Sequence, residues 1–258
     1  MEGGTRRKRP RWWVQVGLVG LVFWAYDAIN NLNPFRRATA IANGLSVLHL
    51  EDRLHLTPER VLNHWLAGHI TFGRFLADYY DTAHFAVTIA MLVFVYWRLP
   101  ERYRFLRNAL LGINAIGFIV FWVFPCAPPR MLPGFVDIVA VTHAIGAWST
   151  GALASQANEY AAMPSLHVAW ALWCCVAVWF LRRDWPSRLL AVAYVIFTAT
   201  AVMATANHYF LDVMAGAATA GLAALIALAY ERRRARPASI EGRAVEPDAN
   251  FSVEQLSV

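Results

Sequence analysis

The stretch Met163-Pro-Ser-Leu-His167, which opens the apolar run 164–181 (PSLHVAWALWCCVAVWFL), decides the fold of this chain. It places an ionisable imidazole near the start of a segment whose other residues are suited to the interior of a lipid bilayer. The same arrangement recurs 41 residues later, where His208-Tyr-Phe-Leu-Asp212 opens a second apolar run. Polar groups at the edge of a bilayer are disfavoured unless they are partnered, and they often mark functional sites. We therefore expect a membrane protein with a site at one membrane face.

The composition places the whole chain among polytopic membrane proteins. Of its 258 residues, 58% are hydrophobic and only 16% are charged, and the mean hydropathy is +0.40. A helix needs about 20 apolar residues to cross the hydrocarbon core of a bilayer. The windows of suitable length predict an all-α bundle of six transmembrane helices: Trp12–Asn30, Tyr79–Trp97, Asn108–Phe124, Pro164–Leu181, Leu189–Asn207 and His208–Tyr230.

The distribution of Lys and Arg predicts the face of the membrane that each loop occupies. The amino-terminal tail, the Arg98–Arg107 loop, the Arg182–Arg188 loop and the tail after Tyr230 hold 17 of the 23 basic residues. By the positive-inside rule both termini are cytoplasmic, and the two histidine motifs open on the extracytoplasmic side of the cell (plasma) membrane. Basic flanks beside anionic lipid headgroups account for the net charge of +6, so no nucleic-acid partner is expected.

One membrane domain, residues 12–230, is expected between a basic tail at 1–11 and a basic, then disordered tail at 231–258. Segment 36–77 is too polar to cross the membrane but carries apolar residues at helical spacing, which is typical of amphipathic helices on a membrane surface. Segment 126–162 is interrupted by Pro and Gly, and we expect it to cover the site as an outer loop with a short interfacial helix.

In this topology three polar motifs lie at the same face of the membrane, so one pocket can contain all of them. They are Phe124-Pro-Cys-Ala-Pro-Pro-Arg-Met131, Met163-Pro-Ser-Leu-His167 and Thr205-Ala-Asn-His-Tyr-Phe-Leu-Asp212. On a helix, His208 and Asp212 stand at i and i+4, so the carboxylate can hold one imidazole nitrogen and leave the other for a substrate. His208 is therefore a candidate nucleophile toward phosphorus, and His167 a candidate general acid and base.

Anion-binding groups accompany these histidines. Arg130 offers a forked donor for phosphoryl oxygens, and the helix start at Ser165 adds backbone N–H donors. The further candidate substrate contacts are Asn207, Tyr209 and His84. His84 has an alternative interpretation as a core residue with its own hydrogen bond.

Neither the cysteines nor the carboxylates suggest a metal site. Cys126, Cys174 and Cys175 match no metal-ligand spacing, and no cluster of carboxylates is available to hold Mg²⁺. The residues thus predict phosphoryl transfer through a phosphohistidine without a metal or another cofactor.

The three motifs resemble the signatures of the type-2 phosphatidic acid phosphatase (PAP2) and haloperoxidase superfamily. They resemble more closely the branch that contains inositol phosphorylceramide synthase and its bacterial relatives. The likeness is carried by Pro125-Cys-Ala-Pro-Pro-Arg130 and the two histidine motifs, and it extends from about Tyr79 to Gly216. It implies a PAP2-type helical bundle in which His208 is the nucleophile, Asp212 its orienting partner, His167 the acid/base and Arg130 a phosphate ligand.

Departures from the general signatures bear on the substrate. Val123 stands where the pattern has Lys, Val202 where it has Arg, and Leu166 where it has Gly. Two cationic phosphate contacts are missing, so either another residue supplies the charge or the site accepts a phosphodiester with one negative charge in place of a phosphomonoester dianion. The second option favours a transferase that acts on a lipid headgroup linkage. The first expectation is therefore a phosphotransferase that moves a phospho-headgroup, such as phosphoinositol, between a lipid and an alcohol. A lipid phosphatase acting on phosphatidic acid or polyprenyl phosphate with water is the alternative, and a transporter or scaffold is the third.

Overall fold

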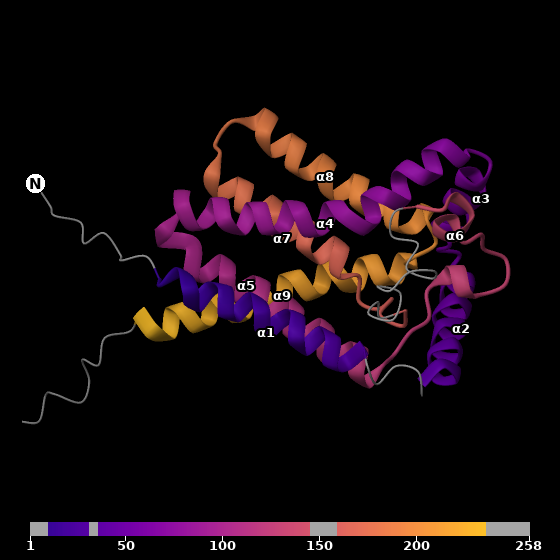
Figure 1. Cartoon of the computed structure of the whole chain (residues 1–258), viewed down its shortest axis with the longest axis horizontal. Helices are drawn as coiled ribbons and strands as arrows, with labels where there is room; N and C mark the ends of the chain where they lie inside the picture. The colour runs from indigo at the N-terminus through magenta and orange to yellow at the C-terminus, as the bar shows by residue number, and fades with distance from the viewer. Residues whose placement is uncertain (1–9, 31–35, 145–158, 236–258) are drawn as a thin grey trace, which may run out of the picture.

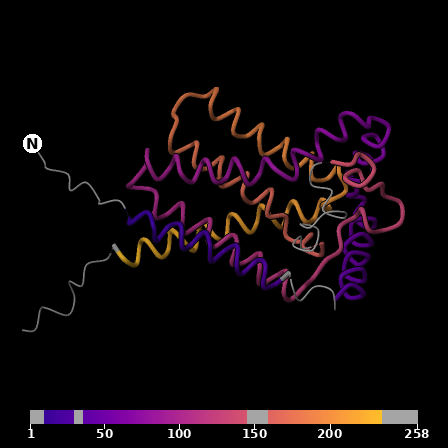
Figure 2. The backbone as a smooth tube through the Cα atoms, in the orientation of Figure 1, coloured from indigo at the N-terminus to yellow at the C-terminus, as the bar shows by residue number. Residues whose placement is uncertain are grey.

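The computed structural model describes residues 10–30, 36–144 and 159–235, which form a bundle of helices (Figure 1; Figure 2). In chain order the elements are α1 (Trp12–Asn30), α2 (Arg37–Leu54), α3 (Pro58–Ala67), α4 (Ile70–Arg98), α5 (Pro100–Val123), η2 (Pro129–Met131), α6 (Ile138–Thr142), α7 (Leu166–Leu181), α8 (Trp185–Ala204) and α9 (Phe210–Ala235). An isolated bridge between Cys126 and Ala161 is the β contact within these ranges. The predicted all-α class is confirmed.

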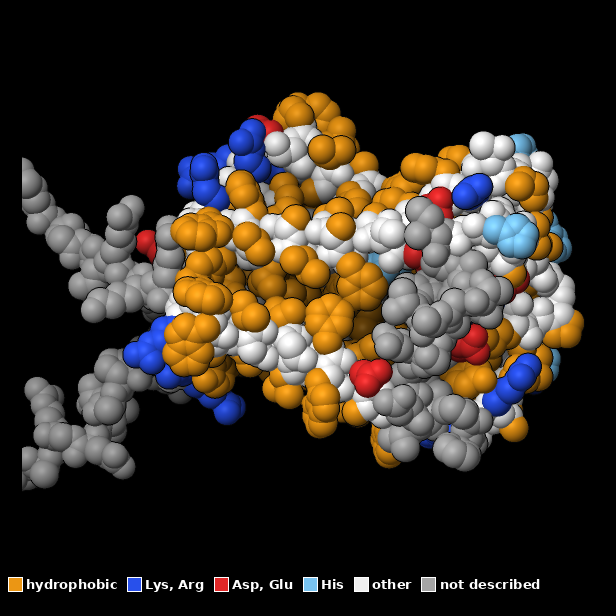
Figure 3. Space-filling view, in the orientation of Figure 1, with side chains coloured by type: hydrophobic (Ala, Val, Ile, Leu, Met, Phe, Trp, Pro, Cys, Tyr) orange, Lys and Arg blue, Asp and Glu red, His pale blue; other side chains and the backbone are white. Residues whose placement is uncertain are grey.

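Five of the described helices, α1, α4, α5, α8 and α9, are long and apolar enough to cross a membrane. The remaining predicted span, α7, has 16 residues. At 1.5 Å per residue it covers about 24 Å, less than the roughly 30 Å of a hydrocarbon core. It packs against α4, α5, α8 and α9 inside the bundle. Hydrophobic side chains cover the middle of the molecule, and Lys and Arg gather at one end, which we call the basic end (Figure 3).

Helix boundaries differ from the sequence prediction in ways that matter for the site. Helix α4 begins at Ile70 rather than Tyr79, so residues 70–77 are its first turns and not part of the interfacial segment. Helix α9 begins at Phe210, so His208 lies in the preceding loop and Asp212 in the first helical turn. The prediction that both residues stand on one helix is therefore wrong.

Segment 36–77, for which the sequence predicts amphipathic helices on the membrane surface, contains α2, α3 and the first turns of α4. Figure 1 shows α2 lying across the end of the bundle opposite the basic end, with α3 beside α6. The buried amide of Asn63 in α3 donates to the carbonyls of Val136 (2.9 Å) and Ala204 (3.1 Å) and accepts from Val136 N–H (2.8 Å). This side chain joins α3 to the outer loop and to the end of α8.

The core of the bundle lies between α5, α7 and α9. Trp173 of α7 is buried there, and its indole N–H donates to the carbonyl of Leu106 in α5 at 2.7 Å. Small residues bring α9 close to its neighbours: a Cβ on Gly216 would collide with the carbonyl oxygen of Ser165, which precedes α7. This close approach sets the distance between the two histidine motifs.

Parts of the predicted tails and outer loop lie outside the described residues, namely 1–9, 145–158 and 236–258. Within the described part of the outer loop, α6 occupies the position of the predicted interfacial helix. Helix α9 continues five residues past the predicted span end at Tyr230 and carries Arg232, Arg233 and Arg234 in its last turn, where cations are favourable.

Candidate active site

The junction of α8 and α9 presents His208 through a tight reversal of the chain. Ala206 has a φ of 55°, in the left-handed region, and the N–H groups of Asn207 and His208 both donate to the carbonyl of Val202 (3.0 and 3.1 Å). The carbonyl of Ala206 in turn accepts from Arg130 N–H at 2.9 Å. Two motifs that lie far apart in sequence are thereby joined through their backbones.

Both ring nitrogens of His208 have defined surroundings. Nδ1 lies 2.8 Å from the carbonyl oxygen of Ala162 and 3.4 Å from Oδ2 of Asp212. A carbonyl only accepts, so Nδ1 carries the proton and Nε2 keeps its lone pair. Nε2 lies 3.3 Å from Nδ1 of His167. Burial lowers the pKa of His208 to about 3, so the imidazole is neutral at physiological pH.

His167 lies in the first turn of α7 among aromatic rings of α4. Its ring centroid is 4.3 Å from that of Tyr80 and 4.1 Å from that of His84. His84 Nδ1 lies 2.6 Å from the carbonyl oxygen of Tyr80. Both interpretations of His84 thus have structural support, since it makes a local hydrogen bond and also forms the wall beside His167.

Arg130 is held in place by two side chains. Its guanidinium donates to Oδ1 of Asn207, and Nε lies 3.7 Å from Oδ2 of Asp137. The Asn207 amide also donates to Thr205 Oγ1 at 2.9 Å. Asn207 lines the same cavity as Arg130 and fixes the direction of that guanidinium.

Two predicted substrate contacts have supporting positions instead. The Ser165 N–H donates to the carbonyl of Asp212 (3.0 Å), and its Oγ accepts from Val168 N–H (3.5 Å) at the start of α7. Tyr209 donates its hydroxyl to the carbonyl of Ala127 at 2.9 Å. Both residues are fully buried and lie outside the cavity lining, so they hold the motifs together. The substrate contacts that the sequence predicts for these two residues stay predictions.

A cavity of ≈ 740 Å³ begins at His167, His208 and Arg130 and runs between α1, α4 and α5. Its apolar walls include Leu18 and Phe118, and its far end reaches residues near the basic end of the bundle. Figure 3 shows a hollow among hydrophobic side chains in the middle of the molecule. The site is thus continuous with a long apolar groove.

Four carboxylate side chains and two arginines, Arg107 and Arg130, line this cavity. The carboxylates among its lining residues are Asp27, Asp81, Asp137 and Glu159. Arg130 is the guanidinium beside the two histidines. Val123 is 71% exposed and Val202 is buried, and neither lines the cavity, so these positions contribute no hydrophobic contact to it.

Sequence reasoning missed two glutamates that support α9. Glu51 of α2 and Glu59 of α3 are fully buried, and Glu51 Oε1 accepts from Leu211 N–H at 2.6 Å. The Glu59 carboxyl group lies near that of Glu51 and near Phe210 N–H. Burial raises the pKa of Glu51 to about 8 and also raises that of Glu59, so the pair retains a proton at neutral pH.

A signal for Glu51 was present in the sequence. The buried residues Gly44, Val47 and Leu48 of α2 stand at helical spacing, and Glu51 continues that stripe. A carboxylate on the apolar face of a short amphipathic helix indicates a buried partner, because an unpaired buried charge is costly.

A comparison of the chain with known protein families agrees with the geometry of this site. A family model described as the PAP2 superfamily matches residues 45–226, well over half of the chain, including all three polar motifs. The chain belongs to the PAP2 superfamily. No curated protein and no solved structure matches it. The match begins inside α2, so this PAP2 region includes the interfacial helices that carry Glu51 and Glu59. Membership supports lipid-phosphate chemistry of the phosphatase or phosphotransferase type.

Proposed function

We propose that this PAP2 protein is a membrane phosphotransferase that moves a phospho-headgroup from a lipid to an alcohol through a phosphohistidine on His208. The observation that carries the proposal is the orientation of the His208 ring. Its Nδ1 proton is directed at the Ala162 carbonyl and Asp212, so the Nε2 lone pair is directed at His167 and the cavity. A neutral, fixed imidazole is a competent nucleophile.

In the first step Nε2 of His208 forms a bond to phosphorus as the bond from phosphorus to the leaving oxygen breaks. His167 gives a proton to that oxygen, and Asp212 stabilises the positive charge that develops on the His208 ring. In the second step His167 takes a proton from the acceptor hydroxyl, which attacks phosphorus and releases His208. In-line displacement puts the leaving oxygen opposite the nucleophile, so the two rings have to separate from their 3.3 Å contact when substrate enters.

The charge around the site supports a phosphodiester substrate. Arg130 matches the single negative charge of a diester, whereas the second charge of a monoester such as phosphatidic acid calls for a further cation beside the two histidines. The Glu159 carboxylate, which also lines the cavity, can accept hydrogen bonds from the hydroxyls of a polyol. These features favour a polyol headgroup or acceptor such as inositol, in line with the resemblance to the inositol phosphorylceramide synthase branch.

The apolar groove supports a lipid as the donor. It leads from the histidines between α1, α4 and α5, and its lining is largely hydrophobic. A lipid whose phosphate lies at Arg130 can place an acyl chain along Leu18 and Phe118. With both termini cytoplasmic, as the basic loops predict, this reaction takes place at the extracytoplasmic face of the cell membrane.

Purified protein incubated with headgroup-labelled phosphatidylinositol tests the proposal. In EDTA, we expect label to move to an added lipid alcohol such as ceramide, with release of diacylglycerol, and turnover of phosphatidylinositol to exceed that of phosphatidic acid. Release of inorganic phosphate from phosphatidic acid, with no transfer to any alcohol, would support the lipid phosphatase instead. A strict requirement for a divalent cation would contradict the metal-independent mechanism.

A further inference from the structure

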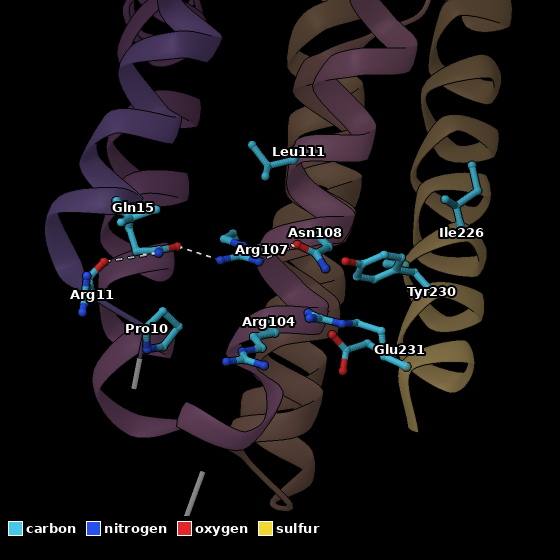
Figure 4. A pocket seen from close by; sticks show the side chains of 13 residues that line it. Pro10, Arg11, Gln15, Arg104, Arg107, Asn108, Leu111, Ile226, Tyr230 and Glu231 are labelled. Carbon is cyan, nitrogen blue, oxygen red and sulfur yellow. Dashed lines mark hydrogen bonds between the residues drawn. The ribbon is translucent and has the colours of Figure 1, made fainter. Parts of the chain in front are cut away.

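A second pocket lies at the basic end of the bundle, opposite the active site. It has a volume of ≈ 500 Å³ and lies between the start of α1, the first turns of α5 and the last turns of α9 (Figure 4). Figure 4 shows Arg104 and Arg107 extending from α5 into the space beside α1, and Tyr230 and Glu231 reaching in from α9. Neither catalytic histidine lines this pocket.

The pocket has an excess of guanidinium groups. Its lining contains four arginines and one carboxylate, Glu231; the arginines are Arg11, Arg104, Arg107 and Arg234. Arg107 is fixed by hydrogen bonds from its guanidinium to Gln15 Oε1 (3.0 Å) and to Asn108 Oδ1 (2.8 Å). A guanidinium held in this way is well suited to phosphate oxygens, because little side-chain entropy is lost on binding.

The walls beside these arginines are apolar. Val14, Leu111 and Ile226 contribute to the lining. Gln15, Arg107 and Leu111 line both this pocket and the groove that leads to the active site. A bound molecule with an anionic head at the arginines therefore has an apolar path for a chain between α1 and α5.

We propose that this pocket binds an anionic phospholipid, with the phosphate among the arginines and an acyl chain in the adjoining groove. Basic pockets between transmembrane helices are suited to anionic headgroups at a membrane surface. The apolar walls favour a lipid over a soluble phosphate. Basic residues at one end of a bundle also help to orient a protein in the membrane, and this role does not need them to line a pocket. Arg98 and Arg183 lie at the same end, are exposed and do not line the pocket.

Lipid retention by the full-length protein tests this site without reference to turnover. The protein is purified in detergent with equimolar phosphatidylglycerol and phosphatidylcholine, and bound lipid is counted by native mass spectrometry. The test variant is Arg104→Gln/Arg234→Gln, which leaves the hydrogen bonds of Arg107 in place. The control is Arg98→Gln/Arg183→Gln, which removes the same charge at the same end of the molecule.

We expect wild type and control to retain phosphatidylglycerol in preference to phosphatidylcholine, and the test variant to bind phosphatidylglycerol about tenfold more weakly. We also expect phosphatidylglycerol, but not sodium phosphate, to raise the melting temperature of wild type. Equal retention by the two double variants, or protection by sodium phosphate alone, would overturn the proposal. Lipid retention is measured without catalysis. Neither result therefore bears on the proposed phosphotransferase activity, which the headgroup-transfer assay tests separately.

Discussion

Oε1 of Glu51 accepts a 2.6 Å hydrogen bond from the backbone N–H of Leu211, one residue before Asp212. This bond ties α2, which lies across the end of the bundle, to the first turn of α9. The N–H groups of a first helical turn lack partners within the helix, so a carboxyl oxygen that accepts from one of them is favourable there. The surface helix and the Asp212 carboxylate are thus positioned by the same contact.

The Glu51 carboxyl group should make stability depend on pH. Its pKa is raised to about 8 in the folded protein, mainly by burial, with Glu59 and Asp212 adding to the effect. The folded state therefore holds a proton that the unfolded chain releases near pH 4.5. The contribution is complete below that value and is lost as pH rises through about 8. Glu51→Gln keeps the acceptor oxygen for Leu211 and should flatten the fall in melting temperature between about pH 4.5 and pH 8.

Glu101→Gln is the matched control for this experiment, since Glu101 is an exposed glutamate at the start of α5. It should leave the pH dependence of the melting temperature unchanged. Arg60 lies near Glu59, and its positive charge lowers the pKa of the Glu59 carboxyl group. Both variants should therefore keep Arg60. If wild type and Glu51→Gln lose stability in parallel as pH rises, the shared-proton interpretation is wrong.

Gly216→Ala should damage the site by separating its two histidine motifs. The added methyl would collide with the Ser165 carbonyl, and a rigid backbone atom cannot move aside cheaply. We expect a loss of about 1–3 kcal/mol in stability and lower activity, because His167 lies only two residues after Ser165. Gly221→Ala, on the same helix with open space at Cβ, should be neutral or slightly stabilising. Thermal unfolding and turnover measurements that rank the two variants equally would contradict this.

Phosphoenzyme trapping separates the roles of the candidate catalytic groups. His208→Ala should give no acid-labile phosphoenzyme. His167→Ala should slow turnover by about 10²-fold or more, which is the rate contribution typical of a general acid. Asp212→Asn should leave a slow enzyme, because the amide keeps the Tyr209 N–H contact but loses the charge that stabilises the imidazolium. Full activity of His208→Ala would rule out the phosphohistidine.

Thiol labelling in intact cells tests the predicted orientation. Val61 of α3 is 72% exposed at the active-site end, and Arg183 is exposed in the loop between α7 and α8. In a Cys175→Ser background, where Cys126 and Cys174 are buried, Val61→Cys should react with an impermeant reagent and Arg183→Cys should not. The reverse pattern would place the active site on the cytoplasmic side.

Local chemistry was sufficient to predict the membrane bundle and the three polar motifs. Apolar runs of about 20 residues have to be helices in a bilayer, because backbone groups there need partners within the segment. The motifs at Arg130, His167 and His208 were predicted to meet because alternate loops of such a bundle share a face, and the structure brings them together. The assignment to the PAP2 superfamily followed from those residues and is confirmed, whereas the closer resemblance to the inositol phosphorylceramide synthase branch stays a prediction.

Only the tertiary structure decided how each side chain of the site is held. The loop position of His208, the burial of Ser165 and Tyr209, and the Glu51 contact with Leu211 all depend on chain segments up to 160 residues apart. Periodicity reports which face of a helix is apolar, but not which backbone N–H it meets across the bundle. Sequence spacing therefore determined the residue types and the class of chemistry, whereas packing between distant helices decided the direction of each hydrogen bond and the path of the groove.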